Sequence, residues 1–302
     1  MGLFNRDRSR PEEPADETLT ELTVSEAQRL RDLVRSSMAG AGYEVIVYAG
    51  HVEDADGRQF GFSTLARRLS EVPAKHWAKI IDDHVRRMLA SVDGPDVFDV
   101  PTEELLDRTY LRLYEADGLP EAGWWTYGRE AFPGVVELLA LDLPDSVATF
   151  NDEQVARHGL AELRAAGLRN LRREEAEDRV THDGVEILAG SMFLASTVLV
   201  LRDVVLRTTG EASLPNGVLV AVPFRHQLMY HVPRDGGVVE ALNAMVGIAA
   251  HTYGTEVGPI SPHVYWWREG EFHQLTHMTD DRIEVRVEGE FADVFARLFP
   301  ES

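Results

Sequence analysis

The sequence predicts an α+β protein in which mixed sheets are flanked by helices and two lobes share or abut one core. Helical and strand patterns follow one another in mixed order, without the steady alternation of strand and helix that a doubly wound fold requires. A continuous apolar run over residues 217–223 is typical of a strand buried on both faces of a sheet. The chain of 302 residues is long enough for one large domain or two modest lobes.

Residues 1–18 are expected to form a disordered tail, because they are charged, carry prolines and have little to bury. The first lobe is expected over residues 19–116. It begins with a capping box, in which the hydroxyl of Thr23 and the carboxylate of Glu26 satisfy free amide groups at the start of a helix. The elements expected in this lobe are a helix ending at Gly40, strands over 43–48 and up to Phe62, an amphipathic helix over 74–91, a short helix over 102–108 and a strand over 110–114.

The segment 117–134 is rich in glycine and proline and is the expected boundary between the lobes. The second lobe is then expected over residues 135–302, and the alternative is one continuous domain over 19–302. The elements expected after the boundary are a strand over 135–141, a long helix over 152–173, a short strand over 186–188, an uncharged helix reaching residue 201, strands over 217–223 and 224–232, a helix over 238–253, a hairpin of 263–267 and 272–275, a strand over 283–287 and a helix over 291–299.

The charge of the chain limits the kinds of partner that it can bind, and its N-terminal sequence predicts its compartment. The net charge is −21, and residues 1–150 hold 16 basic and 28 acidic side chains against 14 and 23 in the remainder. Neither half offers the basic surface that nucleic acid or an anionic membrane requires, so we expect no such partner. The N-terminus has no apolar run after its basic residues, which predicts a cytoplasmic protein. The uncharged stretch 187–201 is shorter than the ~20 residues that span a bilayer.

Common catalytic and cofactor motifs are missing from the sequence. There is no phosphate-binding loop of the GxxxxGK type, no GxSxG and no HExxH, and the Gly40-Ala-Gly42 pair precedes its strand instead of following one. Cysteine is absent, which excludes disulfides, thiolate metal sites and a cysteine nucleophile. Six of the eleven histidines lie in the last 77 residues, but their spacing is poor for metal ligation. We expect no cofactor and no metal.

The candidate binding residues are Arg225, His226 and Tyr230, with Trp267 and Arg268 from the hairpin. The first three follow a doubly buried strand, and loops after buried strands are where sites gather. Tryptophan and arginine dominate binding hot spots. Two plainer interpretations stand beside this one: Arg225 pairs with a carboxylate such as Asp203, and the aromatic run around Trp267 packs in the core.

Four segments of the second lobe resemble the YtpQ-like family: residues 166–171, 193–199, 217–230 and 264–272. Their order and spacing are similar to those of this bacterial cytoplasmic family, whose domain has no known function. The resemblance covers roughly residues 25–278 and is closest from about residue 135 onward. One position departs from the family pattern, because His226 stands where family members often place an acidic residue. The resemblance implies a fold and a compartment but no reaction.

The absence of a catalytic constellation favours a non-enzymatic binding or adaptor protein with a protein partner or a small molecule as its ligand. An alternative from another class is a hydrolase that uses His226 with Arg225 and Tyr230. A third hypothesis is a structural partner within an acidic complex.

Overall fold

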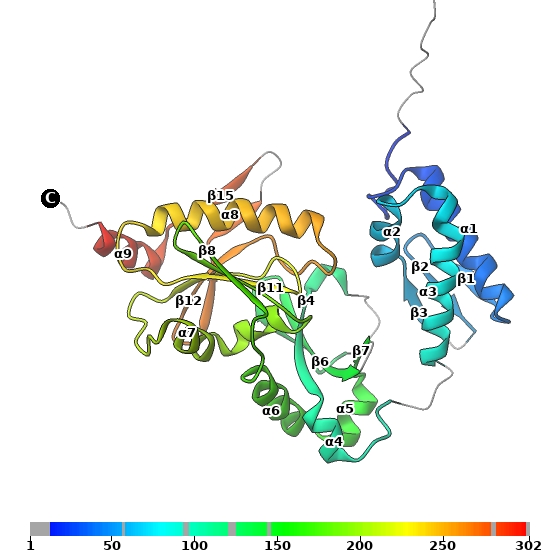
Figure 1. The fold of residues 1–302 in the computed structure, drawn as a ribbon, viewed down its shortest axis with the longest axis horizontal. Helices are drawn as coiled ribbons and strands as arrows, with labels where there is room; N and C mark the ends of the chain where they lie inside the picture. The colour runs from blue at the N-terminus through cyan, green and yellow to red at the C-terminus, as the bar shows by residue number, and fades with distance from the viewer. Residues whose placement is uncertain are drawn as a thin grey trace, which may run out of the picture. The chain divides into compact units, whose positions relative to one another are not determined.

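The computed structural model describes residues 13–55, 58–92, 97–119, 125–143, 146–278 and 282–299. The chain divides into two compact units, Met1–Val97 and Phe98–Ser302 (Figure 1). Each unit combines helices with sheets, which confirms the α+β class. Every strand pair in the described part of the chain is antiparallel, so its sheets do not mix parallel and antiparallel strands.

The first unit packs three helices and a three-stranded sheet around one apolar cluster that includes Leu30, Val52 and Trp77. The predicted capping box at Thr23 and Glu26 is confirmed at the start of α1. The indole of Trp77 is 1% exposed, and its Nε1 donates to the carbonyl of Val72 at 2.9 Å. The elements are α1 (Val24–Gly40), β1 (Val45–Val47), β2 (His51–Asp54), β3 (Gln59–Gly61), α2 (Ser63–Ser70), a 3₁₀ turn η1 (Ala74–His76) and α3 (Trp77–Val92).

Residues 13–18 belong to this ordered unit, contrary to the expectation of a disordered tail over 1–18. Asp16 is buried, and each of its carboxylate oxygens accepts a hydrogen bond from Arg31 at 3.0 Å. Ala15 also forms a β-bridge with Thr23. These contacts order a segment whose composition alone suggests disorder. The rest of the expected tail, residues 1–12, lies outside the described residues.

The second unit begins with a four-stranded antiparallel sheet. Its central strand β6 (Val135–Leu143) pairs with β4 (Thr109–Glu115) along seven residue pairs. The expected boundary at 117–134 therefore falls inside this unit, because the pairing of β4 with β6 joins both sides of it. The remaining elements of this part are α4 (Thr102–Asp107), a 3₁₀ turn η2 (Ala116–Gly118), β5 (Arg129–Phe132) and β7 (Ser146–Thr149).

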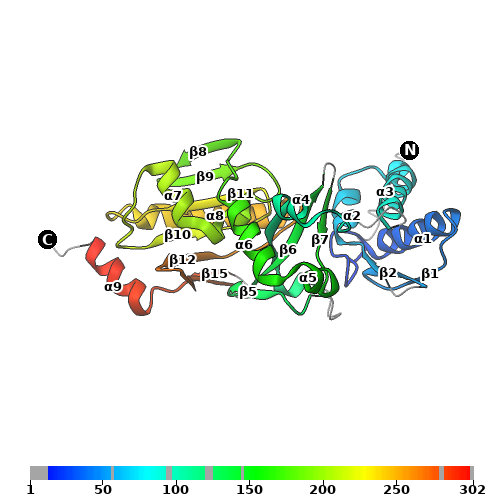
Figure 2. The same ribbon diagram turned by 90° about the horizontal axis from the view of Figure 1, so that it is seen from below.

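The unit also contains a six-stranded sheet in the order β13-β12-β10-β11-β9-β8, of which Figure 2 labels β12, β10, β11, β9 and β8. All four residues of β10 are buried, which confirms the predicted doubly covered strand. One face packs against α8 (Val238–Thr255) and α9 (Gly289–Leu298) through an apolar cluster that includes Met229, Met245 and Trp266. Its strands are β8 (Asp178–His182), β9 (Val185–Ala189), β10 (Val218–Ala221), β11 (Gln227–His231), β12 (Val264–Arg268) and β13 (Glu271–Gln274).

The helices and the last hairpin of the unit surround this sheet. The 3₁₀ segment η3 contacts β11 and β4, and α8 contacts β9 to β12. The elements are α5 (Asp152–His158), α6 (Leu160–Leu171), η3 (Leu194–Val200), α7 (Leu201–Thr209), α8 (Val238–Thr255), the hairpin of β14 (Thr276–Met278) with β15 (Ile283–Val285), and α9 (Gly289–Leu298). Within the described ranges, no helix is long and apolar enough to cross a membrane.

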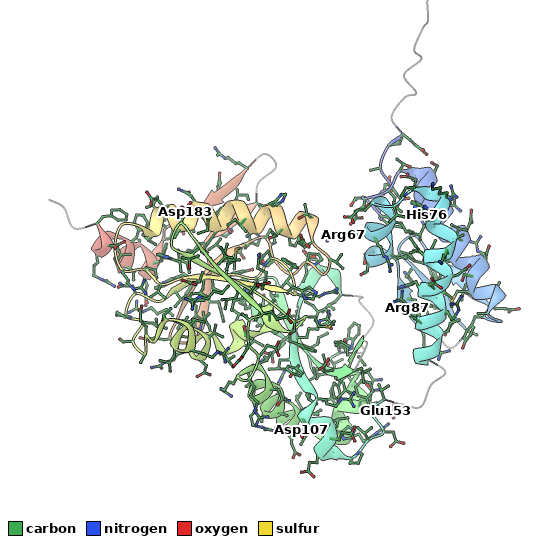
Figure 3. All side chains as sticks on the ribbon, viewed as in Figure 1. Arg67, His76, Arg87, Asp107, Glu153 and Asp183 are labelled. Atoms are coloured by element: carbon green, nitrogen blue, oxygen red, sulfur yellow. The ribbon has the colours of Figure 1, made fainter. Side chains whose placement is uncertain are left out.

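Backbone conformation explains two differences from the predicted elements. The helix expected over 152–173 is broken into α5 and α6 at Gly159, whose φ of 88° is incompatible with a right-handed helix. The uncharged helix expected up to residue 201 is instead a strand followed by the buried 3₁₀ segment η3. The hairpin of β8 and β9 was not predicted, and its turn carries Asp183 in the left-handed region at φ 48° (Figure 3).

Candidate functional site

The loop that joins β10 to β11 carries Arg225 and His226 and is fixed by backbone hydrogen bonds on two sides. The amide of Arg225 donates to the carbonyl of Gly258 at 3.0 Å. The amide of Ala195 donates to the carbonyl of Arg225 at 3.3 Å, and that of Gly190 donates to the carbonyl of His226 at 3.1 Å. The loop therefore presents its two polar side chains from a rigid backbone, as a binding site requires.

The ring of His226 lies between Arg225 and a backbone carbonyl. Its Nδ1 is 2.9 Å from the carbonyl oxygen of Gly190, which can only accept, so Nδ1 carries the proton. Its Nε2 accepts a hydrogen bond from Nε of Arg225 at 3.0 Å. Both ring nitrogens are thus engaged in the neutral imidazole, and the ring orients the guanidinium of Arg225.

A second arginine, Arg112 of β4, lies near the Arg225 loop, because residues 195 and 196 bind both segments. The amide of Leu113, the next residue of β4, donates to Oγ of Ser196 at 3.2 Å, and the amide of Ala195 donates to the carbonyl of Arg225. Burial and the positive charge of Arg112 lower the pKa of the Arg225 guanidinium. Both side chains are half-buried, and the Nε of Arg112 is inaccessible to solvent and has no hydrogen-bond acceptor. The guanidinium of Arg112 lies 5.2 Å from the ring centre of Tyr114. We call Arg112 and Arg225 the arginine pair.

The arginine pair has no acidic partner within the part of the chain that the structure describes. The alternative interpretation that Arg225 pairs with Asp203 is wrong, because Asp203 pairs with Arg172 at 2.9 Å. The carboxylate of Glu115, at the end of β4, accepts a hydrogen bond from the hydroxyl of Tyr253, and no carboxylate contributes to the pKa shift of Arg225. Two neighbouring positive charges without a carboxylate are unusual, since half-buried charges are normally compensated. The arrangement is suited to binding an anion.

Gly258 allows the side chain of Arg225 to take its position. A β-carbon at Gly258 would lie 2.8 Å from Cδ and 3.1 Å from Nη1 of Arg225. Gly258 also has a φ of +80°, a conformation that side chains with a β-carbon rarely adopt. Glycine is therefore required here for two independent reasons.

Tyr230 is not part of this arrangement. It lies four residues after His226, about 13 Å along an extended chain. Its side chain is fully buried, and its hydroxyl is hydrogen-bonded to the hydroxyl of Thr208 on α7. Burial raises the pKa of the Tyr230 phenol. The structure therefore places Tyr230 in the core, away from the arginine pair.

Trp267 and Arg268 lie at the opposite end of the sheet from Arg225. Trp267 pairs with Val218 at the first residue of β10, whereas the Arg225 loop follows the last residue of that strand. Trp267 is half-buried. The neighbouring Trp266 is 1% exposed and donates from Nε1 to the carbonyl of Asn216 at 2.9 Å, as the core interpretation predicts. The five candidates therefore do not form one site.

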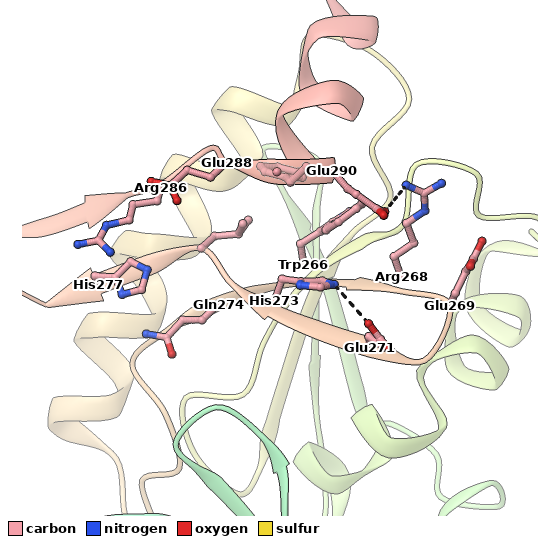
Figure 4. Close-up of a pocket in the computed structure, with 13 residues that line it drawn as sticks. Trp266, Arg268, Glu269, Glu271, His273, Gln274, His277, Arg286, Glu288 and Glu290 are labelled. Carbon is pink, nitrogen blue, oxygen red and sulfur yellow. Dashed lines mark hydrogen bonds and ion pairs between the residues drawn. The ribbon is translucent and has the colours of Figure 1, made fainter.

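Arg268 contributes instead to a cavity of about 740 Å³ between the β12–β13 hairpin and the start of α9 (Figure 4). Its guanidinium pairs with Glu290 at 3.1 Å and lies 5.7 Å from the ring centre of Trp266. His273 and Glu271 also line the cavity, with 4.0 Å between Nε2 and the carboxylate. Acidic and basic side chains both line this cavity, and the positive charge of Arg268 is already compensated by Glu290.

No cluster of three or more potential metal ligands occurs among the described residues. The sequence reasoning located Arg225 and His226 but missed Arg112 and Gly258. The sequence signal for Arg112 was a charged residue within an otherwise apolar and aromatic run, residues 110–114. Comparison with known proteins finds no matching family model, no matching curated protein and no matching solved structure.

Proposed function

We propose that this protein is a non-enzymatic binding protein that recognises an anionic group through the arginine pair, Arg112 and Arg225. The observation that carries the proposal is the presence of two half-buried guanidinium groups that lie within range of each other's charge, neither of them paired with a carboxylate among the described residues. Arginine binds oxyanions in a bidentate manner and remains charged when partly buried. An anion at this position would accept hydrogen bonds from Nη groups that have no acceptor among the described residues.

The binding function is better supported than the hydrolase alternative. A general base needs a free lone pair, but the lone pair on Nε2 of His226 accepts from Arg225. Tyr230, the third residue of that hypothesis, has its hydroxyl engaged with Thr208 in the core. His226 is therefore assigned the role of a positioning residue for Arg225.

The proposed setting is the cytoplasm, with a small molecule or a protein as ligand and with no nucleic-acid or membrane partner. The net charge of −21 supports the exclusion of polyanions, because the long-range field repels them. Only an anion small enough to approach the arginine pair closely benefits from its local positive charge.

Isothermal titration calorimetry of the full chain with phosphate, sulfate and acetate tests the proposal. We expect saturable binding of at least one anion, and a loss of at least tenfold in affinity in Arg112→Gln and in Arg225→Gln. Arg268→Gln is the matched control, because it removes one arginine from the same unit at the opposite end of the sheet. Equal affinity in the wild type and both arginine-pair variants would refute the proposed function.

A further inference from the structure

We infer that the arginine pair takes a dianionic group of the phosphate monoester class, carried by a small molecule. This inference rests on the proposed function and specifies its ligand. It follows from the charge around the pair, from the number of hydrogen-bond donors that it leaves unmatched, and from the way in which the chain encloses it.

The charge that faces the arginine pair amounts to two uncompensated positive charges. His226 is neutral with both ring nitrogens engaged, and the hydroxyl of Tyr114 is hydrogen-bonded to that of Thr149 at 2.9 Å. Among the described residues, Arg112 and Tyr114 are the ionisable side chains that act on the pKa of Arg225, and no carboxylate does. A monoanion would compensate only one of the two arginines. A phosphate monoester carries a charge of about −1.5 to −2 at neutral pH and compensates both.

The unmatched donors also favour a phosphate group over a carboxylate. A guanidinium has five N–H donors, and among the residues that the structure describes only the Nε–H of Arg225 has an acceptor. Within the described residues, no hydrogen bond from Arg112 to an acceptor is formed. A carboxylate offers two oxygens, whereas a phosphate monoester offers three terminal oxygens that can face two separate guanidinium groups.

The surroundings of the arginine pair favour a small ligand over a phosphorylated protein segment. Both arginine side chains are half-buried, and the segments 190–195 and 258–260 hold the Arg225 loop from two sides. The acidic chain would also repel the further carboxylates of an acidic phosphopeptide. The phosphate of a low-molecular-weight monoester meets neither obstacle.

Phenyl phosphate, phenyl sulfate and benzoate distinguish these features, because they share a ring and differ in the anionic group. Titration calorimetry of the full chain at pH 7.5 should show phenyl phosphate binding at least tenfold more tightly than either monoanion. Between pH 7.5 and pH 5 this advantage should fall by about tenfold, because the second phosphate ionisation lies near pH 6. Phenyl sulfate remains a monoanion at both values and therefore controls for titration of the protein.

The variants separate this inference from the proposed function. Arg112→Gln and Arg225→Gln should each abolish the preference for phenyl phosphate, while Arg268→Gln retains it. If a Gln variant does not fold, Arg225→Lys keeps the charge but loses the planar fork, and it should weaken phenyl phosphate binding. Equal binding of phenyl phosphate and phenyl sulfate would overturn the dianion inference and leave the proposed function standing. Failure of all three probes to bind would overturn both, and tighter binding of a phosphoserine tetrapeptide than of phenyl phosphate would overturn the assignment of a small ligand.

Discussion

The arginine pair predicts that replacing Arg112 with methionine stabilises the protein. The buried Nε–H of Arg112 has no acceptor, and an unsatisfied buried donor costs about 1–3 kcal/mol. The substitution also removes the repulsion from Arg225, and it loses a contact with the ring of Tyr114 of the kind that contributes about 0.5–1 kcal/mol. The balance is a gain of about 1 kcal/mol, because methionine retains the apolar contacts of the aliphatic part of the arginine side chain.

Calorimetric melting of Arg112→Met measures this gain. A stabilisation of about 1 kcal/mol should raise the Tm of a unit of this size by about 2–4 °C. The matched control is Arg108→Met, which removes a hydrogen bond of 2.8 Å from Nε of Arg108 to the carbonyl of Asp142 and should lower the Tm. If Arg112→Met lowers the Tm as far as Arg108→Met does, Arg112 has a structural partner and the reasoning about the arginine pair is wrong.

Three further predictions concern single residues. Gly258→Ala should lower the Tm and weaken phosphate binding at least tenfold, because its β-carbon would displace Arg225; calorimetric melting and titration measure the two effects, and an unchanged affinity would contradict the positioning role. Trp77→Ala should destabilise the first unit by about 3–5 kcal/mol, as truncation of a buried aromatic does, and urea unfolding measures the loss. A parent-like unfolding midpoint would show that this side chain is not in the core. Asp16→Asn should reduce stability at neutral pH, because the hydrogen bonds from Arg31 lower the pKa of Asp16 from 3.8 to about 2. A carboxyl group whose pKa is lower in the folded state stabilises the protein at pH values above its unfolded pKa. The difference in unfolding free energy between wild type and variant should therefore disappear as the pH falls from 3.8 towards 2. A difference that does not depend on pH would exclude this ion pair as its source.

Local sequence signals predicted the elements of the fold better than its long-range pairings. The capping box of α1 and the apolar run of β10 depend on neighbouring residues, and both are confirmed. The boundary between the lobes was misplaced, because the pairing of β4 with β6 depends on contacts across the intervening segment. The break at Gly159 had a visible signal in the glycine itself, but glycine is also tolerated within helices.

The candidate site was predictable only as far as one loop. Arg225 and His226 follow a buried strand, and sequence reasoning therefore found them together. Trp267 and Arg268 could not be placed without the register, which pairs Trp267 with the far end of β10. Arg112 comes from another sheet more than a hundred residues earlier, and no spacing rule connects it with Arg225. The YtpQ-like resemblance remains a prediction.

The position of His226 offers a test that separates binding from hydrolysis by a single change of charge. Glutamate and glutamine have the same shape, and both can accept a hydrogen bond from Nε of Arg225 in place of the imidazole Nε2. In His226→Glu, a carboxylate beside Arg225 would neutralise half of the arginine pair, so phenyl phosphate should bind at least tenfold more weakly. In His226→Gln, the positive charge remains uncompensated, and the affinity should stay within about threefold of the wild type, where tenfold equals about 1.4 kcal/mol.

A hydrolase that uses His226 as its base would behave differently. His226→Gln removes the base and would abolish turnover, whereas the carboxylate of His226→Glu can still accept a proton. Calorimetric titration of the two variants, with recovery of the ligand to check that it is unchanged, distinguishes the two functions. Equal loss of binding in His226→Gln and His226→Glu would show that the imidazole itself is required. The reason for the contrasting expectation is electrostatic: what the site needs at this position is a neutral acceptor that holds Arg225 in place without cancelling its charge.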